Sequence, residues 1–241
     1  MGPPSPPGET PPLINEAPVV DYTNSQFRFR GLTTKFALKA RTKMYESFLR
    51  TLQPTAETTI VDIGATPDAV TEDSNFLEKW YPHPERITAT SIEDASYLEE
   101  AHPGVTFVQT AGGDRLPFED RQFDIAFSSA VIEHVGDRSQ QRQFISEMVR
   151  VSKRFFLTTP DRRFPMELHT FLPFVHWLPQ QHHQSILRKV GKTTWASTEN
   201  LNLLDEKSLR ELFPPGSSVA VDGVSLMGMR SNLVVHGSSP A

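Results

Sequence analysis

Several histidine and carboxylate side chains follow short apolar runs of the sequence, and these are the groups best suited to moving a proton near neutral pH. Three of them are candidate general bases: His134, Asp161 and His169. His134 comes soon after the apolar run 123–128, and His176 is a further candidate. For His134, a hydrogen bond to a neighbouring loop is an equally good interpretation. A base at such a position would take the proton of a hydroxyl acceptor.

The same histidines could be imagined as metal ligands. His169 and His176 are seven residues apart and would share one face of a helix, although Pro173 can interrupt it. With His182 and His183 nearby, the spacing still matches no standard ligand pattern. The chain has no cysteine, which excludes disulfides and thiolate metal sites. The sequence therefore predicts no metal site.

Short apolar runs alternate with helical patterns over most of the chain, and this alternation predicts the scaffold. Strands are expected at 58–63, 86–90, 105–109, 123–128 and 155–159. Helices are expected at 36–52, 75–80, 93–102, 139–151 and 205–213. Two last strands at 219–224 and 232–236 are separated by a short link and should pair antiparallel. Strands alternating with helices predict a parallel sheet, in which ligands lie beyond the carboxyl ends of the strands.

The end of the first expected strand resembles a known cofactor-binding motif. Residues 59–68 read Thr-Ile-Val-Asp-Ile-Gly-Ala-Thr-Pro-Asp. This is similar to the first motif of class I (Rossmann-like) S-adenosylmethionine-dependent methyltransferases, methyltransferase type 11-like. Asp62 and Gly64 match the motif, whereas Thr66 and Asp68 replace its second and third glycines. The resemblance implies that Asp62, Gly64 and Thr66 border the cofactor.

Two later stretches carry the same resemblance. The family's third and fourth motifs resemble one continuous stretch of this chain. It reads Leu-Pro-Phe at 116–118, then Phe-Asp, an apolar strand and Glu-His-Val at 133–135. By position in the family, Gly113 and Asp114 border the adenine, and Ser129 and Ala130 border the reactive methyl group. The run at 155–162, Phe-Phe-Leu-Thr-Thr-Pro-Asp-Arg, is similar to a fifth strand that ends in Thr-Pro-Asn.

A second departure from the family follows the second strand. There the family usually places an acid that binds both ribose hydroxyls, but this chain has Ser91, followed by Ile92. A serine makes one hydrogen bond where a carboxylate makes two charge-assisted ones. Glu93 could take over if the turn is one residue longer. Ser91 and Ile92 complete the expected cofactor site.

The resemblance implies an α/β fold with a seven-stranded, mostly parallel, doubly wound sheet, an antiparallel C-terminal hairpin and a helical insertion after strand five. We expect three parts: a disordered proline-rich tail at 1–24, a basic helical segment at 25–57, and the methyltransferase domain at 58–241. The insertion at 161–200 is rich in aromatic residues and histidines. It could serve as core packing, as a lid over the acceptor or as a membrane-facing patch.

The predicted function is methyl transfer from S-adenosylmethionine, most simply to an oxygen of a small-molecule, sugar or lipid-linked acceptor. The alternative is a methyltransferase-like binding or regulatory protein without turnover, and a nicotinamide enzyme has the wrong glycine pattern. A net charge of -5 gives no reason to expect nucleic acid. No transmembrane segment or secretory signal is expected, peripheral membrane contact is compatible with the basic segment, and the expected location is the cytoplasm. The sequence does not predict an oligomeric state.

Overall fold

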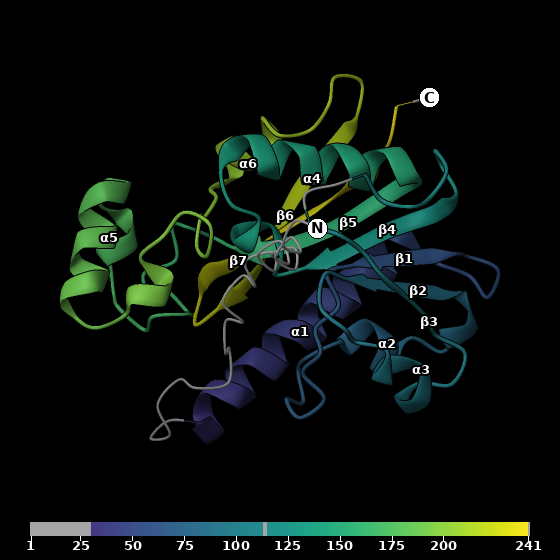
Figure 1. Cartoon of the computed structure of the whole chain (residues 1–241), viewed down its shortest axis with the longest axis horizontal. Helices are drawn as coiled ribbons and strands as arrows, with labels where there is room; N and C mark the ends of the chain where they lie inside the picture. The colour runs from purple at the N-terminus through teal and green to yellow at the C-terminus, as the bar shows by residue number, and fades with distance from the viewer. Residues whose placement is uncertain (1–29, 113–114, 241) are drawn as a thin grey trace, which may run out of the picture.

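The computed structural model describes residues 30–112 and 115–240, with side chains from Lys35 onward. Its centre is a seven-stranded sheet of order β3-β2-β1-β4-β5-β7-β6 (Figure 1). The strands are β1 Ile60–Ile63, β2 Ile87–Ser91, β3 Thr106–Gln109, β4 Phe123–Ser129, β5 Ser152–Pro160, β6 Ser218–Leu226 and β7 Met229–Ser238. The predicted strands are all present, and their order reverses direction at β1, which is where doubly wound sheets bind ligands.

The first five strands run parallel and the last two do not. β1 pairs in parallel with β2 and β4, and β4 with β5. β7 is antiparallel to both β5 and β6, with Leu157 opposite Val235. The predicted seven-stranded, mostly parallel sheet with an antiparallel C-terminal hairpin is therefore confirmed.

Helices cover both faces of the sheet. On one face, α1 Arg30–Leu52, α2 Phe76–Trp80 and α3 Tyr97–Ala101 contribute to a buried apolar cluster with β1, β2 and β4. On the other, α4 Arg138–Val151 and α6 Glu206–Arg210 pack on β4, β5 and β7. Figure 1 shows these two layers above and below the sheet. The three short helices are shorter than predicted, since α2 was expected at 75–80, α3 at 93–102 and α6 at 205–213.

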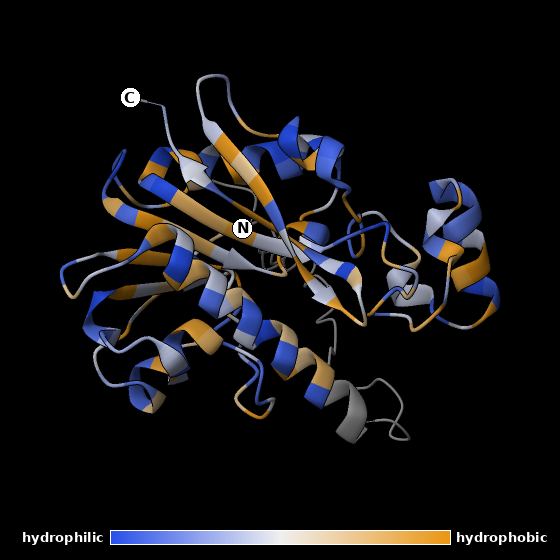
Figure 2. Ribbon diagram, turned by 180° about the vertical axis from the view of Figure 1, so that it is seen from behind, coloured by the Kyte–Doolittle hydropathy of each residue, from blue (hydrophilic) through white to orange (hydrophobic). Residues whose placement is uncertain are grey.

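The basic segment forms the long helix α1, which packs against the sheet. Met44, Phe48 and Leu52 are buried, and the Phe48 ring lies edge-on to Phe127 and Phe156 at 5.3 and 5.4 Å. Figure 2 shows hydrophobic and hydrophilic bands alternating along this helix. An apolar stripe at this spacing places one face of α1 in the core and leaves the lysines outside.

The segment after β5 departs from the sheet and carries α5 Gln180–Lys189, which stands at one end of the molecule (Figure 1). The helical insertion was predicted, but the idea that His169 and His176 share a helix is wrong. Phe171 and Phe174 have positive φ angles of 55° and 61°, which no helix accommodates. The Glu167 carboxylate accepts the backbone N–H groups of His169 and Thr170, so this stretch turns tightly.

Some expectations fall on residues that the structure does not describe. The proline-rich tail, the first residues of the basic segment, Gly113 and Asp114 lie outside the described ranges. Among the described helices, none is both long and apolar enough to cross a membrane.

Candidate functional site

The residues expected to border the cofactor meet at the carboxyl ends of β1, β2 and β4. Gly64 follows β1 directly and has a φ of 100°, a conformation that L-residues rarely adopt. Its N–H and that of Ala65 both donate to the Thr90 carbonyl at 2.9 Å. A methyl group on Gly64 would overlap the isopropyl group of Val131. The single retained glycine of the motif is therefore required both by backbone conformation and by a close approach.

The loop after Gly64 is held by side chains where the family has glycines. Asn75 accepts the Thr66 N–H at 2.9 Å and donates to the Thr66 carbonyl at 2.8 Å. Asp68 accepts the N–H groups of Val70 and Thr71. Asn75 makes no capping hydrogen bond at the start of α2 and braces this loop instead. The loop is ordered by amide and carboxylate contacts.

Asp62 lies in a buried carboxyl pair with Glu78 of α2. The two residues are 6% and 3% exposed. Burial, together with the charge and proximity of Glu78, holds the pKa of Asp62 well above its usual range, and burial also raises the pKa of Glu78. Two ionised carboxylates would repel each other in a poorly solvated space, so the pair shares a proton more readily than an isolated carboxyl group would. The pair lies between β1 and α2.

Ser91 and Ile92 end β2 beside this loop. The Ser91 hydroxyl accepts the Glu93 N–H at 3.2 Å, and the Ser91 carbonyl accepts the Thr110 N–H at 2.8 Å. Ile92 is 65% exposed, which is unusual for a large apolar side chain beside a sheet edge. An exposed isoleucine here offers an apolar surface to a planar ring.

Ser129 and Ala130 end β4, and an arginine from α1 reaches them. Arg41 donates to the Ser129 hydroxyl at 2.7 Å, lies 3.7 Å from the Asp73 carboxylate and packs over the Phe76 ring. Sequence reasoning missed Arg41, because α1 lies outside the motifs. A signal was present, since Arg41 precedes Met44 and Phe48 by three and seven residues and so falls on the apolar face of the helix.

The structure brings His134 and His169 together. Their ring centroids are 4.8 Å apart and nearly perpendicular, and the Trp195 ring lies 4.9 Å from His169. His134 lies in the short turn η2 Ile132–His134, just after β4, and its Nδ1 is 2.7 Å from the Asn200 carbonyl. The insertion therefore folds back over the end of β4 and places His169 beside His134.

The two histidines differ in their electrostatic surroundings. Burial lowers the pKa of His134 and outweighs the opposing charge of Glu133. Burial also acts to lower the pKa of His169, but the Glu167 carboxylate, 2.7 Å from its Nδ1, more than offsets this and raises it. The same contact lowers the pKa of Glu167 to about 2. Two neighbouring imidazoles with pKa values shifted in opposite directions are typical of functional sites.

Asp161 and His176 lie in other contacts. The buried Asp161 carboxylate forms an ion pair with Arg230 at 2.7 Å and accepts the Arg163 N–H at 2.9 Å. His176 is buried, and its Nε2 is 2.8 Å from the Phe164 carbonyl. Both of the Asp161 oxygens are thus engaged in structural contacts, which favours a stabilising role for this residue.

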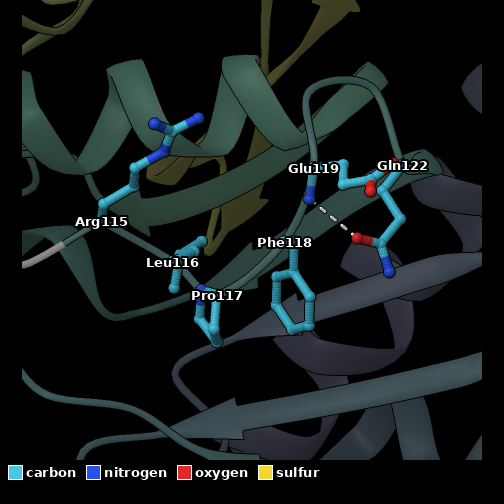
Figure 3. Close-up of a pocket in the computed structure, with 6 residues that line it drawn as sticks. All are labelled: Arg115, Leu116, Pro117, Phe118, Glu119 and Gln122. Carbon is cyan, nitrogen blue, oxygen red and sulfur yellow. Dashed lines mark hydrogen bonds between the residues drawn. The ribbon is translucent and has the colours of Figure 1, made fainter.

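An open hollow of about 700 Å³ lies along the Leu-Pro-Phe segment (Figure 3). Its lining includes Arg115, Pro117 and Phe118, and the Glu119 N–H donates to the Gln122 side chain at 2.9 Å. This segment leads into the amino end of β4, whereas Ser129 is the last residue of that strand. The hollow is therefore separate from the edge that carries His134 and His169.

A family model matches part of the chain. Residues 61–154 match a family model described as a methyltransferase domain. The match runs from β1 into β5 and contains Asp62, Gly64, Ser129 and His134. No curated protein matches the sequence significantly.

Solved structures share the fold over most of the chain. Magnesium protoporphyrin IX methyltransferase from Synechocystis PCC 6803, with bound S-adenosylhomocysteine, has a TM-score of 0.56 at 14% identity. The match covers 90% of this chain and 91% of the methyltransferase chain. A possible histamine N-methyltransferase from Thermotoga maritima has a TM-score of 0.53 at 17% identity, with coverages of 86% and 91%. N-methyltransferase NodS from Bradyrhizobium japonicum WM9, also with S-adenosylhomocysteine, has a TM-score of 0.53 at 14% identity. The match covers 86% of this chain and 88% of the NodS chain. The predicted resemblance and the class I methyltransferase fold are confirmed.

Proposed function

We propose that this chain, whose residues 61–154 match a methyltransferase domain model, transfers the methyl group of S-adenosylmethionine to an acceptor hydroxyl. Methyl transfer from a sulfonium is a displacement at an activated carbon, so the protein has to align the two reactants and manage the acceptor's proton. The cofactor lies beyond β1, β2 and β4, along Gly64, Ser91, Ile92 and Ser129.

The observation that carries the choice of a hydroxyl acceptor is the orientation of His134. A carbonyl oxygen only accepts hydrogen bonds, so the Nδ1 of His134 donates to Asn200, and the lone pair of the neutral ring is on Nε2. A fixed imidazole with this tautomer, next to the end of β4, is suited to withdrawing a proton from an oxygen. Arg41 adds a positive charge at the same edge, which suits the carboxylate at the amino acid end of the cofactor.

The insertion supports a large or apolar acceptor, either a small molecule or one linked to a sugar or lipid. Phe171, Phe174 and Trp177 follow the stretch that carries His169 and are 44%, 53% and 49% exposed. Large aromatic side chains at the surface bind apolar ligands or membrane interfaces better than they bind water. Peripheral membrane contact and a cytoplasmic location are part of this proposal.

The test is transfer of a labelled methyl group from S-adenosylmethionine to a panel of phenols, sugars and lipid-linked glycans. We expect His134→Gln to lower turnover by about 10²- to 10⁴-fold, because proton transfer is lost, and to change the affinity for S-adenosylhomocysteine little. His182→Gln, an exposed histidine of α5, is the matched control and should leave turnover unchanged. Unchanged turnover in His134→Gln would assign that histidine a structural role.

A binding or regulatory protein without turnover is the second candidate, and one observation favours it. The N–H groups of Thr66, Val70 and Thr71 are bound by Asn75 and Asp68, so the loop offers fewer backbone donors than a glycine-rich loop does. Binding of S-adenosylhomocysteine together with no methylation across the whole panel would support this candidate over the enzyme.

A further inference from the structure

We propose that Glu133, His134 and His169 form a binding site for one divalent transition-metal cation. One carboxylate oxygen and one nitrogen of each imidazole lie within 4.8 Å of one another. The Nε2 of His134 is 4.0 Å from the Oε1 of Glu133. Two imidazole nitrogens with one carboxylate form a ligand set that binds Zn²⁺, Fe²⁺ or Co²⁺ and leaves further coordination positions open.

The state of Glu133 is the first argument for a cation. Its side chain is completely buried, and its Oε2 accepts the Thr159 hydroxyl at 2.9 Å. Among the described residues, no group makes a hydrogen bond to its Oε1, the oxygen that faces His134. Buried polar atoms in native proteins almost always have a partner, so an unsatisfied carboxylate oxygen aimed at two imidazoles is well suited to binding a cation.

The contacts behind the two histidines are the second argument. The Nδ1 of His134 is held by the Asn200 carbonyl, and the Nδ1 of His169 by the Glu167 carboxylate, each at 2.7 Å. Histidines that bind metals almost always donate their other ring N–H to a carbonyl or a carboxylate, which fixes the tautomer and the ring orientation. Both rings are thus arranged to present Nε2 as the ligand atom.

Charge and access also suit a cation. Glu133 and Glu167 place two carboxylates at the cluster, and the Arg41 guanidinium, whose charge acts on His169, is itself paired with Asp73. The side chains of His134 and His169 are 16% and 17% exposed, so water or an acceptor can approach from outside. Metal–ligand distances of about 2.0–2.2 Å place neighbouring ligand atoms roughly 3 Å apart, so the ligand atoms, which lie within 4.8 Å of one another, must draw together by up to about 2 Å when the cation binds.

This inference deepens the proposed function and rests on it for one point, the place of the acceptor. A cation bound here would coordinate the acceptor's oxygen and lower the pKa of its hydroxyl group. In that state His134 and His169 would be ligands, and the hydroxyl proton would pass to water, which the partial exposure of both histidines admits.

The test is calorimetric titration of the full chain, without a histidine tag and after treatment with a chelator, with ZnCl₂. A parallel titration with CoCl₂ is followed by visible absorption, which reports the coordination of the metal. We expect one Zn²⁺ per chain at micromolar affinity or better. Glu133→Gln keeps the size of the side chain and the Thr159 contact, and it should weaken binding by about 10- to 100-fold or more, as should His169→Gln.

His182→Gln on α5 is the matched control and should bind Zn²⁺ as the wild type does. If circular dichroism shows that Glu133→Gln does not fold, the Zn²⁺ titration of His169→Gln, at a partly exposed side chain, is the test. A folded wild type that binds no Zn²⁺, or variants that bind it equally well, would overturn the inference. Titrating the same samples with S-adenosylhomocysteine separates the two proposals, because its binding does not depend on the metal.

Discussion

Gly64→Ala is expected to lower the free energy of unfolding by about 2–5 kcal/mol and to abolish S-adenosylmethionine binding. A φ of 100° costs an alanine roughly 1–2 kcal/mol, and the overlap of its methyl group with Val131 adds about 1–3 kcal/mol. Any shift that relieves the overlap moves the loop away from the end of β1. Urea denaturation followed by circular dichroism measures the first effect and calorimetry the second.

Gly191→Ala is the matched control for the backbone contribution. Gly191 also has a positive φ, 77°, but a methyl group there would meet no atom within 4 Å. It should cost only about 1–2 kcal/mol and leave cofactor binding intact. Adding Val131→Ala to Gly64→Ala should recover part of the lost stability by removing the overlap. Equal losses in the Gly64 and Gly191 variants would show that the close approach to Val131 contributes nothing.

Arg230→Gln is expected to lower the free energy of unfolding by about 2–4 kcal/mol. Asp161 is 4% exposed, and its ion pair with Arg230 spans the junction between β5 and β7. Removing one partner of a buried pair costs about 3–5 kcal/mol, and the 31% exposure of the Arg230 side chain reduces this figure. Chemical denaturation at neutral pH measures the change.

Arg210→Gln serves as the control, because Arg210 pairs with Glu206 at the surface and should contribute less than about 1 kcal/mol. Adding Asp161→Asn to Arg230→Gln should restore part of the stability, since no buried charge is then left unpaired. If Arg230→Gln costs no more than Arg210→Gln, the pair is not structural, and Asp161 returns as a candidate base.

The sheet could be predicted because its central strands, β1, β2, β4 and β5, are largely buried on both faces and therefore appear as short, continuous apolar runs. Strand ends were less predictable. β7 was expected at 232–236 but runs from Met229 to Ser238, because backbone pairing continues past the apolar residues through Arg230 and Gly237. Hydrophobic patterning reports burial, whereas strand length depends on backbone hydrogen bonds that any residue can make.

The candidate site was only partly predictable. Gly64 follows β1, Ser91 and Ser129 are the last residues of β2 and β4, and the parallel topology alone places them at one edge. The approach of His169 to His134 depends on how the insertion turns at Phe171 and Phe174, and the placement of Arg41 depends on the packing of α1. Such contacts between distant segments arise from tertiary packing, so a local pattern such as the helical spacing of Arg41 places a side chain on a face but does not identify its partner.

The central claim is that this chain binds S-adenosylmethionine at the carboxyl edge of its sheet, and titration calorimetry with S-adenosylmethionine and S-adenosylhomocysteine tests it most directly. We predict micromolar binding of both ligands. Ile92→Glu should weaken it by about tenfold or more, whereas Val70→Glu, at a side chain that is 90% exposed, should leave it unchanged. A folded protein that binds neither ligand at millimolar concentration would contradict the account.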